Sequence, residues 1–251
     1  MEKALVFHHP EFEEEVRQQL QIFDRPIDPS DAARVTQLDL SNFDFLAEDE
    51  LLLENFCQVK SLAINTGSED HSFLQWFPML ETLDMVCWNR CNAVDFRVFR
   101  HLKNLKWLFV SGGDISDIDF LNLDALTDLR SLRNLRLHEF GTVDLKPVEQ
   151  MPWLSGLFCG YANEVRNAKA IGALKRLKEL ELIDIKVEDL GFLDTLPDDL
   201  ALELCGVDVR KGFDPDQLRR FAEYDVCEMF VDGEEIPCAM ASKENIWKKH
   251  L

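Results

Sequence analysis

The sequence predicts an α/β solenoid, a right-handed curved stack of short repeats that share one parallel sheet. The first observation is a six-residue motif: an apolar residue, two variable residues, a leucine, one variable residue and a second leucine or similar residue. Leu177 to Leu182 is the cleanest copy. The second observation is the spacing, because copies begin at residues 35, 59, 80, 105, 132, 154, 177, 199 and 226, in steps of 21 to 27 residues. Self-similarity at a nearly fixed period is the signature of a repeat architecture.

Steps of roughly 20–29 residues are typical of leucine-rich repeats. In each copy the fourth and sixth residues point to one side of a strand, and the third, fifth and seventh point to the other. Stacking buries the leucines in one core and forms a concave sheet of about nine parallel strands. Apolar segments between the copies, such as residues 73–79 and 170–176, predict short helices or 3-10 turns on the convex side.

Three segments follow from this pattern: an N-terminal helical cap at residues 1–34, repeats at 35–212 and a C-terminal cap at 213–251. The N-terminal cap is predicted because Phe12, Val16, Leu20 and Phe23 recur at helical spacing after Pro10. The apolar stripe of this helix is expected to cover the first repeat.

The C-terminal cap is predicted to contain a helix, a hairpin and a tail. Asp214, Pro215 and Gln217 suggest a helix start in which Asp214 caps and Gln217 closes a capping box. Asp232-Gly233 between extended runs predicts a β-hairpin that protects the open sheet edge. The tail, residues 242–251, is expected to form a short helix anchored by Trp247.

The N-terminal third resembles a known family. Residues 5–17 lead through residues 26–31 into the first repeat, Val35 to Leu40, and this arrangement is similar to the cap and first repeat of bacterial internalin-like leucine-rich-repeat proteins. Residues 115–121 also resemble the repeats of that group, and the resemblance spans about residues 5–210. It implies the fold and a bacterial source. No cell-wall anchor or immunoglobulin-like adaptor accompanies it, so it does not imply an adhesion role.

One departure from the family pattern concerns the ninth position of each repeat, where an asparagine side chain usually ties adjacent turns together. This chain has other residues there: Phe43, Gly67, Trp88, Gly113, Phe140, Ala162, Ile185 and Val207. The turns must therefore satisfy their backbone groups in another way. We expect Trp88 and Phe140, at this position, to belong to the core.

The composition favours a protein or peptide partner, basic and with an apolar anchor. With 27 basic and 47 acidic residues the formal charge is −20, which disfavours nucleic acid and anionic membranes. No apolar run approaches the ~20 residues of a membrane span, and the N-terminus is not expected to be a secretory signal. The seven scattered cysteines suggest reduced thiols and a cytoplasmic location.

No sequence motif for catalysis, nucleotides or metals occurs, so we expect no enzyme, no cofactor and no metal. Cys87 and Cys91 could form half of a metal site, but His71 and His101 are not at zinc-motif spacing. The alternative is that these cysteines act as small, buried hydrophobic residues near a turn.

The predicted binding surface is the concave face, where repeat proteins usually bind. Trp107, Phe109 and Phe158 are expected to face solvent beside Arg136 and His138, as an aromatic anchor site rimmed by acid. The candidate residues are Asp84, Val86, Trp107, Phe109, Arg136, His138, Phe158, Tyr161, Glu179, Glu181 and Glu203. The ninth copy is expected to add Glu228, Phe230 and Asp232 to this face. In the alternative interpretation, residues 114–128 or a second copy of the chain cover Trp107 and Phe109.

The leading functional prediction is a monomeric, non-enzymatic module that binds a protein on its concave face. One alternative is an immunity or inhibitor protein that covers a basic toxin or enzyme. Another is a structural protein that assembles with itself. The fold alone does not choose among them, because leucine-rich-repeat frames serve many functions.

Overall fold

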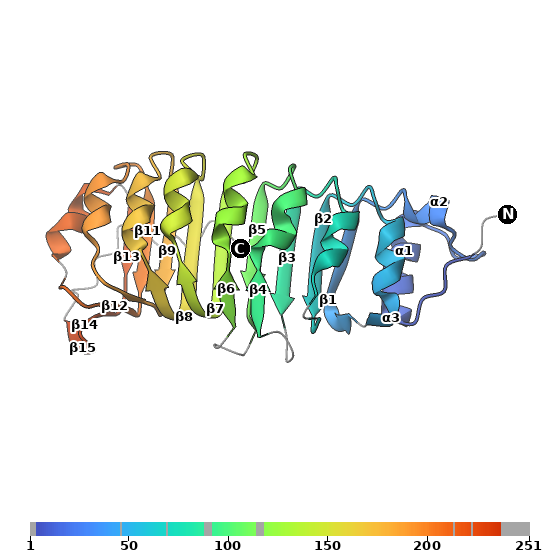
Figure 1. Cartoon of the computed structure of the whole chain (residues 1–251), viewed down its shortest axis with the longest axis horizontal. Helices are drawn as coiled ribbons and strands as arrows, with labels where there is room; N and C mark the ends of the chain where they lie inside the picture. Colours follow the sequence, from blue (N-terminus) through green and yellow to red (C-terminus); the bar gives the residue numbers. More distant parts are fainter. Residues whose placement is uncertain are drawn as a thin grey trace.

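One open parallel sheet of nine strands runs the length of the molecule in sequence order (Figure 1). The computed structural model describes residues 4–45, 47–68, 70–87, 92–113, 118–212, 214–221 and 223–236. The strands are β1 (Gln37–Phe45), β2 (Ser61–Thr66), β3 (Thr82–Cys87), β5 (Trp107–Ser111), β7 (Asn134–Asp144), β8 (Gly156–Arg166), β9 (Glu179–Ile183), β11 (Ala201–Cys205) and β13 (Glu223–Val226). The predicted leucine-rich-repeat solenoid is confirmed.

The predicted zigzag holds in the centre of this sheet. Leu108 pairs with the leucines at the same repeat position in β3 and β7, and it is wholly buried together with Val110. Trp107 and Phe109 lie on the opposite, concave face and are half-buried. Alternation within each strand therefore separates one continuous leucine core from the concave face.

Short 3-10 helices cover the convex side, as predicted (Figure 1). They are η1 (Leu51–Asn55), η2 (Ser72–Trp76), η3 (Phe96–His101), η4 (Leu123–Asp128), η5 (Lys146–Gln150), η6 (Ala168–Ala173), η7 (Gly191–Thr195) and η8 (Pro215–Arg220). Neighbouring helices contact each other along the stack. Their buried residues, such as Phe99 and Leu193, close the core from this side.

Direct backbone hydrogen bonds between repeats take the place of the asparagine ladder. The amide of Ala162 donates to the carbonyl of Asp184 at 3.1 Å, and the amide of Asp184 donates to the carbonyl of Cys205 at 2.8 Å. Further lateral strands continue this pattern: β4 (Ala93–Asp95), β6 (Asp119–Leu121), β10 (Lys186–Val187), β12 (Val207–Val209) and β14 (Met229–Val231). Phe140 is wholly buried, as expected, whereas Trp88 lies outside the described residues.

Two helices form the N-terminal cap, α1 (Pro10–Leu20) and α2 (Pro29–Ala32), and a third, α3 (Ala47–Glu50), follows β1. Phe12 and Val16 are fully buried, which confirms the predicted apolar stripe. The prediction for Phe23 is wrong, because α1 ends at Leu20 and the left-handed Gln21 turns the chain. The side chain of Phe23 is 62% exposed, and Ile22 is buried in its place.

A buried carboxylate ties the chain before α1 to α3. Asp49 is fully buried and accepts hydrogen bonds from the backbone amides of His8 and His9, both at 2.8 Å. The His8 imidazole Nδ1 lies 3.0 Å from the same carboxylate. His8 and His9 therefore have a structural role, because their backbones anchor the cap.

The predicted hairpin is present but lies in the second sheet. β14 pairs antiparallel with β15 (Glu234–Ile236), and Asp232 and Gly233 both have positive φ in the turn between them. The hairpin closes the lateral sheet β10-β12-β14-β15, so the prediction that it protects the concave sheet is wrong. Trp247 and the rest of the tail lie outside the described residues.

The helix start at Asp214 is confirmed, because its side chain accepts a hydrogen bond from the amide of Asp216 at the beginning of η8. The capping box is not formed. The side-chain amide of Gln217 instead faces the Asp194 carboxylate of the preceding repeat, 3.3 Å away. The residue that was expected to close a local cap contacts its neighbouring repeat.

The ninth repeat begins at Phe221, and not at Val226 as the motif suggested. Tyr224 pairs with Leu202 and Val226 pairs with Leu204, so an aromatic residue occupies the fourth position. The step from the eighth copy is 22 residues, which matches the preceding repeats. Glu228, Phe230 and Asp232 therefore do not belong to the concave strands, and residues 223, 225 and 227 take their positions.

Cys205 and Cys227, both at the seventh repeat position, form a disulfide with a Cα–Cα distance of 4.9 Å. The prediction of reduced thiols throughout is wrong for this pair. Cys57 and Cys159 are free, and burial raises the pKa of the Cys159 thiol to about 12. No described helix combines the length and apolar character needed to cross a membrane.

Candidate partner-binding surface

Strand register brings the predicted residues onto one continuous line across the concave face. The fifth positions of the repeats, which we call the concave row, follow one another in the order Asp39, Ala63, Asp84, Phe109, Arg136, Phe158, Glu181, Glu203 and Asp225. Adjacent strands lie about 4.8 Å apart in a sheet, so successive residues of the row lie side by side on this face. Arg136 is the one cation in this row.

Four ring side chains gather in the centre of the concave face, and we call them the His138 cluster: Phe109, His138, Phe158 and Tyr161. The imidazole of His138 stacks on Phe158 with 5.5 Å between ring centroids and meets Tyr161 edge-on at 4.7 Å. Phe109 lies 5.8 Å from the same imidazole. The rings come from β5, β7 and β8, so the parallel sheet positions them.

Phe158 does not face solvent, which corrects the prediction. Its side chain is only 4% exposed, because the Arg136 guanidinium lies 4.4 Å above the ring and His138 stacks beside it. The ring lies along its own strand, over Gly160. A Cβ atom at Gly160 would approach the Phe158 ring to 2.6 Å, so the glycine leaves the room that the ring occupies.

Arg136 joins the aromatic cluster to the acidic half of the row. Its Nη1 and Nη2 atoms each donate to one carboxylate oxygen of Glu181 at 2.9 Å, a bidentate pair that is about three-quarters buried. The guanidinium also lies 5.8 Å from the Trp107 ring. Bidentate geometry and stacking on rings are the arrangements in which arginine binds most strongly.

Trp107 is held by Asp84 on the N-terminal side. The indole Nε1 donates to Oδ1 of Asp84 at 2.8 Å. Burial raises the pKa of Asp84, while this hydrogen bond and the Arg136 charge oppose the rise. Val86, another predicted residue, lies half-buried on β3 and pairs with Ser111.

Carboxylates line the C-terminal side of the row. Glu203 lies between Glu181 and Asp225 on adjacent strands. Burial, followed by the charges of Glu181 and Asp225, raises the pKa of Glu203 to about 7. Glu179 is exposed on the same strand as Glu181. Sequence reasoning missed Asp225, because the ninth repeat was assigned to the wrong register.

Ser111 and Glu139 also belong to this surface, although neither is among the candidate residues. The Ser111 hydroxyl donates to Oε2 of Glu139 at 2.7 Å, and Nδ1 of His138 lies 3.3 Å from that oxygen. Ser111 Oγ is 3.5 Å from the same Nδ1. A serine–histidine–acid relay requires the serine and the acid on opposite ring nitrogens, so these three residues are not arranged as a hydrolase triad.

The exposure of Tyr161 follows from a left-handed turn that recurs in the solenoid. Tyr161 has φ of +57° and is 44% exposed. Residues at the same position of neighbouring repeats, Glu139, Asp184 and Gly206, also have positive φ. A left-handed backbone is costly for residues other than glycine. In the sequence, this conformation is indicated by the small or polar residue that usually occupies this repeat position.

Residues 118–128 do not lie over the His138 cluster. They form β6 and η4, and η4 packs against η3 and η5 on the convex side. Residues 114–117 lie outside the described part of the chain.

His71 lies beside Cys87 at the proposed half metal site. Sγ of Cys87 lies 3.7 Å from Nε2 of His71, and both residues are buried. Cys91 lies outside the described residues. Within the described residues no group of three His, Cys, Asp or Glu side chains could hold a metal ion.

No protein-family model matches the chain, and no curated protein matches its sequence. Among solved structures it is similar to the internalin InlF of Listeria monocytogenes, with 15% identity, a TM-score of 0.62 and coverage of 88% of this chain and 70% of that chain. It is also similar to internalin C2 of Listeria monocytogenes, with 13% identity, a TM-score of 0.54 and coverage of 80% and 92%. The plant peptide hormone receptor RGFR1 in complex with RGF2 gives 15% identity, a TM-score of 0.53 and coverage of 78% and 32%.

At these identities the comparisons establish the fold. The chain has the leucine-rich-repeat fold, of the kind seen in the internalins, and the sequence resemblance to that group is confirmed at this level. What the concave face binds is a separate question, because one frame hosts many functions.

Proposed function

We propose that the protein is a non-enzymatic interaction module that binds a protein or peptide on its concave face, centred on the His138 cluster. The observation that carries this proposal is the contiguity of the surface. Half-exposed Trp107, Phe109 and Tyr161 surround His138 and Arg136 on neighbouring strands of a rigid sheet. Aromatic residues and arginine dominate the energetics of protein interfaces when they are clustered centrally.

The proposed partner is basic and brings an apolar side chain. Arg136 is neutralised by its bidentate pair with Glu181, so the acids on both sides of it leave the concave row negative. Glu203 and Asp225 have no cation of their own among the described residues. Charge complementarity of this kind increases association rates and excludes acidic partners. The complex of RGFR1 with RGF2 supports the idea that this fold presents a surface for a polypeptide.

Affinity capture from the source organism, followed by mass spectrometry, would identify the partner. The variant Trp107→Ala/Tyr161→Asn should then lose most of the binding, because it removes two aromatic contacts while asparagine tolerates the left-handed backbone at residue 161. Phe158 is left in place, because a buried ring cannot be removed without destabilising the fold.

A matched control is Met79→Ala, which removes a side chain of similar exposure (37%) from the segment that follows η2, away from the concave strands. We expect Met79→Ala to keep the partner, and both variants to keep the circular dichroism spectrum. Binding that is unchanged in Trp107→Ala/Tyr161→Asn would discard the concave site.

A second candidate function is inhibition of a basic toxin or enzyme. The observation that favours it is the uncompensated acid at Glu203 and Asp225, which suits a strongly basic target. A toxin gene beside this gene, and loss of toxin activity on mixing the two purified proteins, would support this function. Capture of a partner that is not basic, with binding that high salt leaves unchanged, would argue against this function, because salt screening weakens contacts with a basic target.

A further inference from the structure

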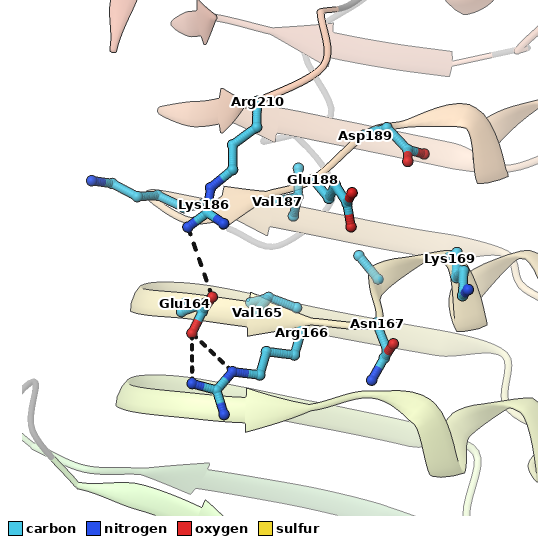
Figure 2. A pocket seen from close by; sticks show the side chains of 11 residues that line it. Glu164, Val165, Arg166, Asn167, Lys169, Lys186, Val187, Glu188, Asp189 and Arg210 are labelled. Atoms are coloured by element: carbon cyan, nitrogen blue, oxygen red, sulfur yellow. Dashed lines mark hydrogen bonds and ion pairs between the residues drawn. The ribbon is translucent and has the colours of Figure 1, made fainter. Parts of the chain in front are cut away.

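A polar hollow of about 310 Å³ lies on the flank of the solenoid, and none of its lining residues belongs to the concave row or the His138 cluster (Figure 2). We call it the flank pocket. It is formed where β8 ends, where η6 begins and where β10 and β12 meet the chain that follows them. Each element supplies one cation: Arg166, Lys169, Lys186 and Arg210. Four cations in one pocket are unexpected on a chain whose formal charge is −20.

The carboxylates of the pocket are already engaged by internal donors. Oε2 of Glu164 accepts from Nε of Arg166 at 2.9 Å, and its Oε1 lies 3.7 Å from the Arg210 guanidinium. Figure 2 shows these two guanidinium groups on either side of Glu164, while the Lys186 side chain extends outward beyond them and Lys169 lies at the other end of the pocket. One carboxylate therefore serves two arginines.

The other two acids are also occupied. Glu188 pairs with Lys211 at 2.6 Å, and Oδ1 of Asp189 accepts from the amide of Gly191 at 3.0 Å. Lys169 and Lys186, in contrast, make no ion pair with any described residue. The pocket thus has positive charge that its own acids do not use.

The floor of the pocket is apolar, whereas its four cations are exposed to solvent. Val165 and Val187 lie at its base and are 4% and 2% exposed. The pocket walls are otherwise polar, so they suit a small charged group better than an apolar ligand.

We propose that the flank pocket binds a doubly charged tetrahedral oxyanion, a phosphate that is either free or carried as a phosphoryl group. Two guanidinium groups and two ammonium groups from successive repeats offer many donors around one hollow, and a phosphate has enough oxygens to accept from several of them. A carboxylate such as Glu164 engages only the two arginines. The phosphate would compete with Glu164 for these arginines and recruit Lys186.

The test titrates inorganic phosphate into the full chain at constant ionic strength and follows binding by calorimetry. Lys186→Ala/Arg210→Ala should weaken binding on the order of tenfold, because two donors are lost. Glu164→Gln should tighten binding, because it removes a competing charge and frees both arginines. The cation variant should therefore bind phosphate more weakly, and the Glu164 variant more tightly, than the natural chain.

Two controls make the same charge changes elsewhere. Arg100→Ala/Lys103→Ala removes two exposed cations near η3, and Glu179→Gln removes an exposed acid on the concave face. Neither should alter phosphate affinity. Binding that does not saturate, or controls that shift it as much as the pocket variants, would overturn the proposal.

A parallel titration with O-phosphoserine distinguishes the two sources of the group. Tighter binding of O-phosphoserine would support the pocket as a receptor for a phosphoryl group on a polypeptide. Tighter binding of inorganic phosphate would support a free anion. Absence of binding by both would overturn the site, without consequence for the concave face.

Discussion

At the scale of single residues, Arg136 connects the two kinds of chemistry on the concave face. Its guanidinium covers Phe158 on one side and holds Glu181 on the other. The residue therefore acts as a packing element and as the counter-ion of a half-buried acid. Removal of one partner from such a pair leaves the other charge without compensation.

We expect Arg136→Leu to lower the free energy of unfolding by about 2 kcal/mol, because Glu181 loses both hydrogen bonds and stays beside Glu203. Urea unfolding at neutral pH measures the change. Arg97→Ala, which breaks an exposed pair with Asp95, is the matched control and should have a much smaller effect. Equal losses in the two variants would show that the buried geometry of Arg136 contributes nothing special.

Glu203 gives the surface a predicted pH dependence. Its pKa in the folded chain, about 7, lies above the ordinary value of 4.5, so the folded state favours the protonated form. This group therefore stabilises the fold most below about pH 4.5, and the contribution is lost as pH rises through about 7. Solvent at the half-buried carboxyl reduces the effect to on the order of 1 kcal/mol.

The substitution Glu203→Gln removes this titration. We expect the variant to be more stable than the natural chain near pH 8 and nearly equal to it near pH 4. Urea unfolding of both proteins across this range provides the comparison, and Glu179→Gln serves as an exposed control. A larger gain in unfolding free energy near pH 4 than near pH 8 would contradict this prediction.

Phe158 shows what alternation predicts and what it leaves out. The pattern placed this residue on the concave face, and the strand register agrees. The predicted solvent exposure of Phe158 was wrong, because exposure depends on which neighbouring side chains cover the ring. Gly160 lies two residues after Phe158 on the same strand, and the absence of a side chain there lets the large ring lie flat under an arginine. A glycine two residues after the phenylalanine was the available signal.

At the scale of elements, the ninth strand marks the limit of motif matching. Val226, Met229 and Val231 fit the apolar template, but these residues divide between the two sheets. The correct copy begins with Phe221 and has Tyr224 in place of leucine. An aromatic residue fills the core as well as leucine does, so the repeat period was the better guide than the residue type.

The disulfide between Cys205 and Cys227 closes a loop of 22 residues around this repeat. Loss of a crosslink of that length should cost about 3 kcal/mol, since the unfolded chain becomes less restricted. We expect Cys227→Ser to accelerate amide hydrogen exchange in β13 in particular. Cys57→Ser, at a free cysteine, is the control and should leave exchange in β13 unchanged. Equal protection of β13 in both variants would argue against the bond.

At the scale of the whole molecule, the solenoid was predictable because its signal repeats. Nine near-copies of one motif fix the sheet, and errors at single copies such as Val226 do not change the architecture. The ends were less predictable, since caps occur once: Phe23 lies beyond its helix, and the hairpin at Asp232 closes a different sheet. The flank pocket was not predicted at all, because its cations are brought together by separate repeats.

The central proposal is that a partner binds the concave face at the His138 cluster. A photoreactive phenylalanine analogue at Tyr161, compared with one at Met79 outside the concave strands, tests this most directly, since both side chains are exposed. Irradiation with the captured partner should give a crosslink from residue 161 and none from residue 79. A crosslink from residue 79 alone would contradict the proposal and place the partner away from the concave face.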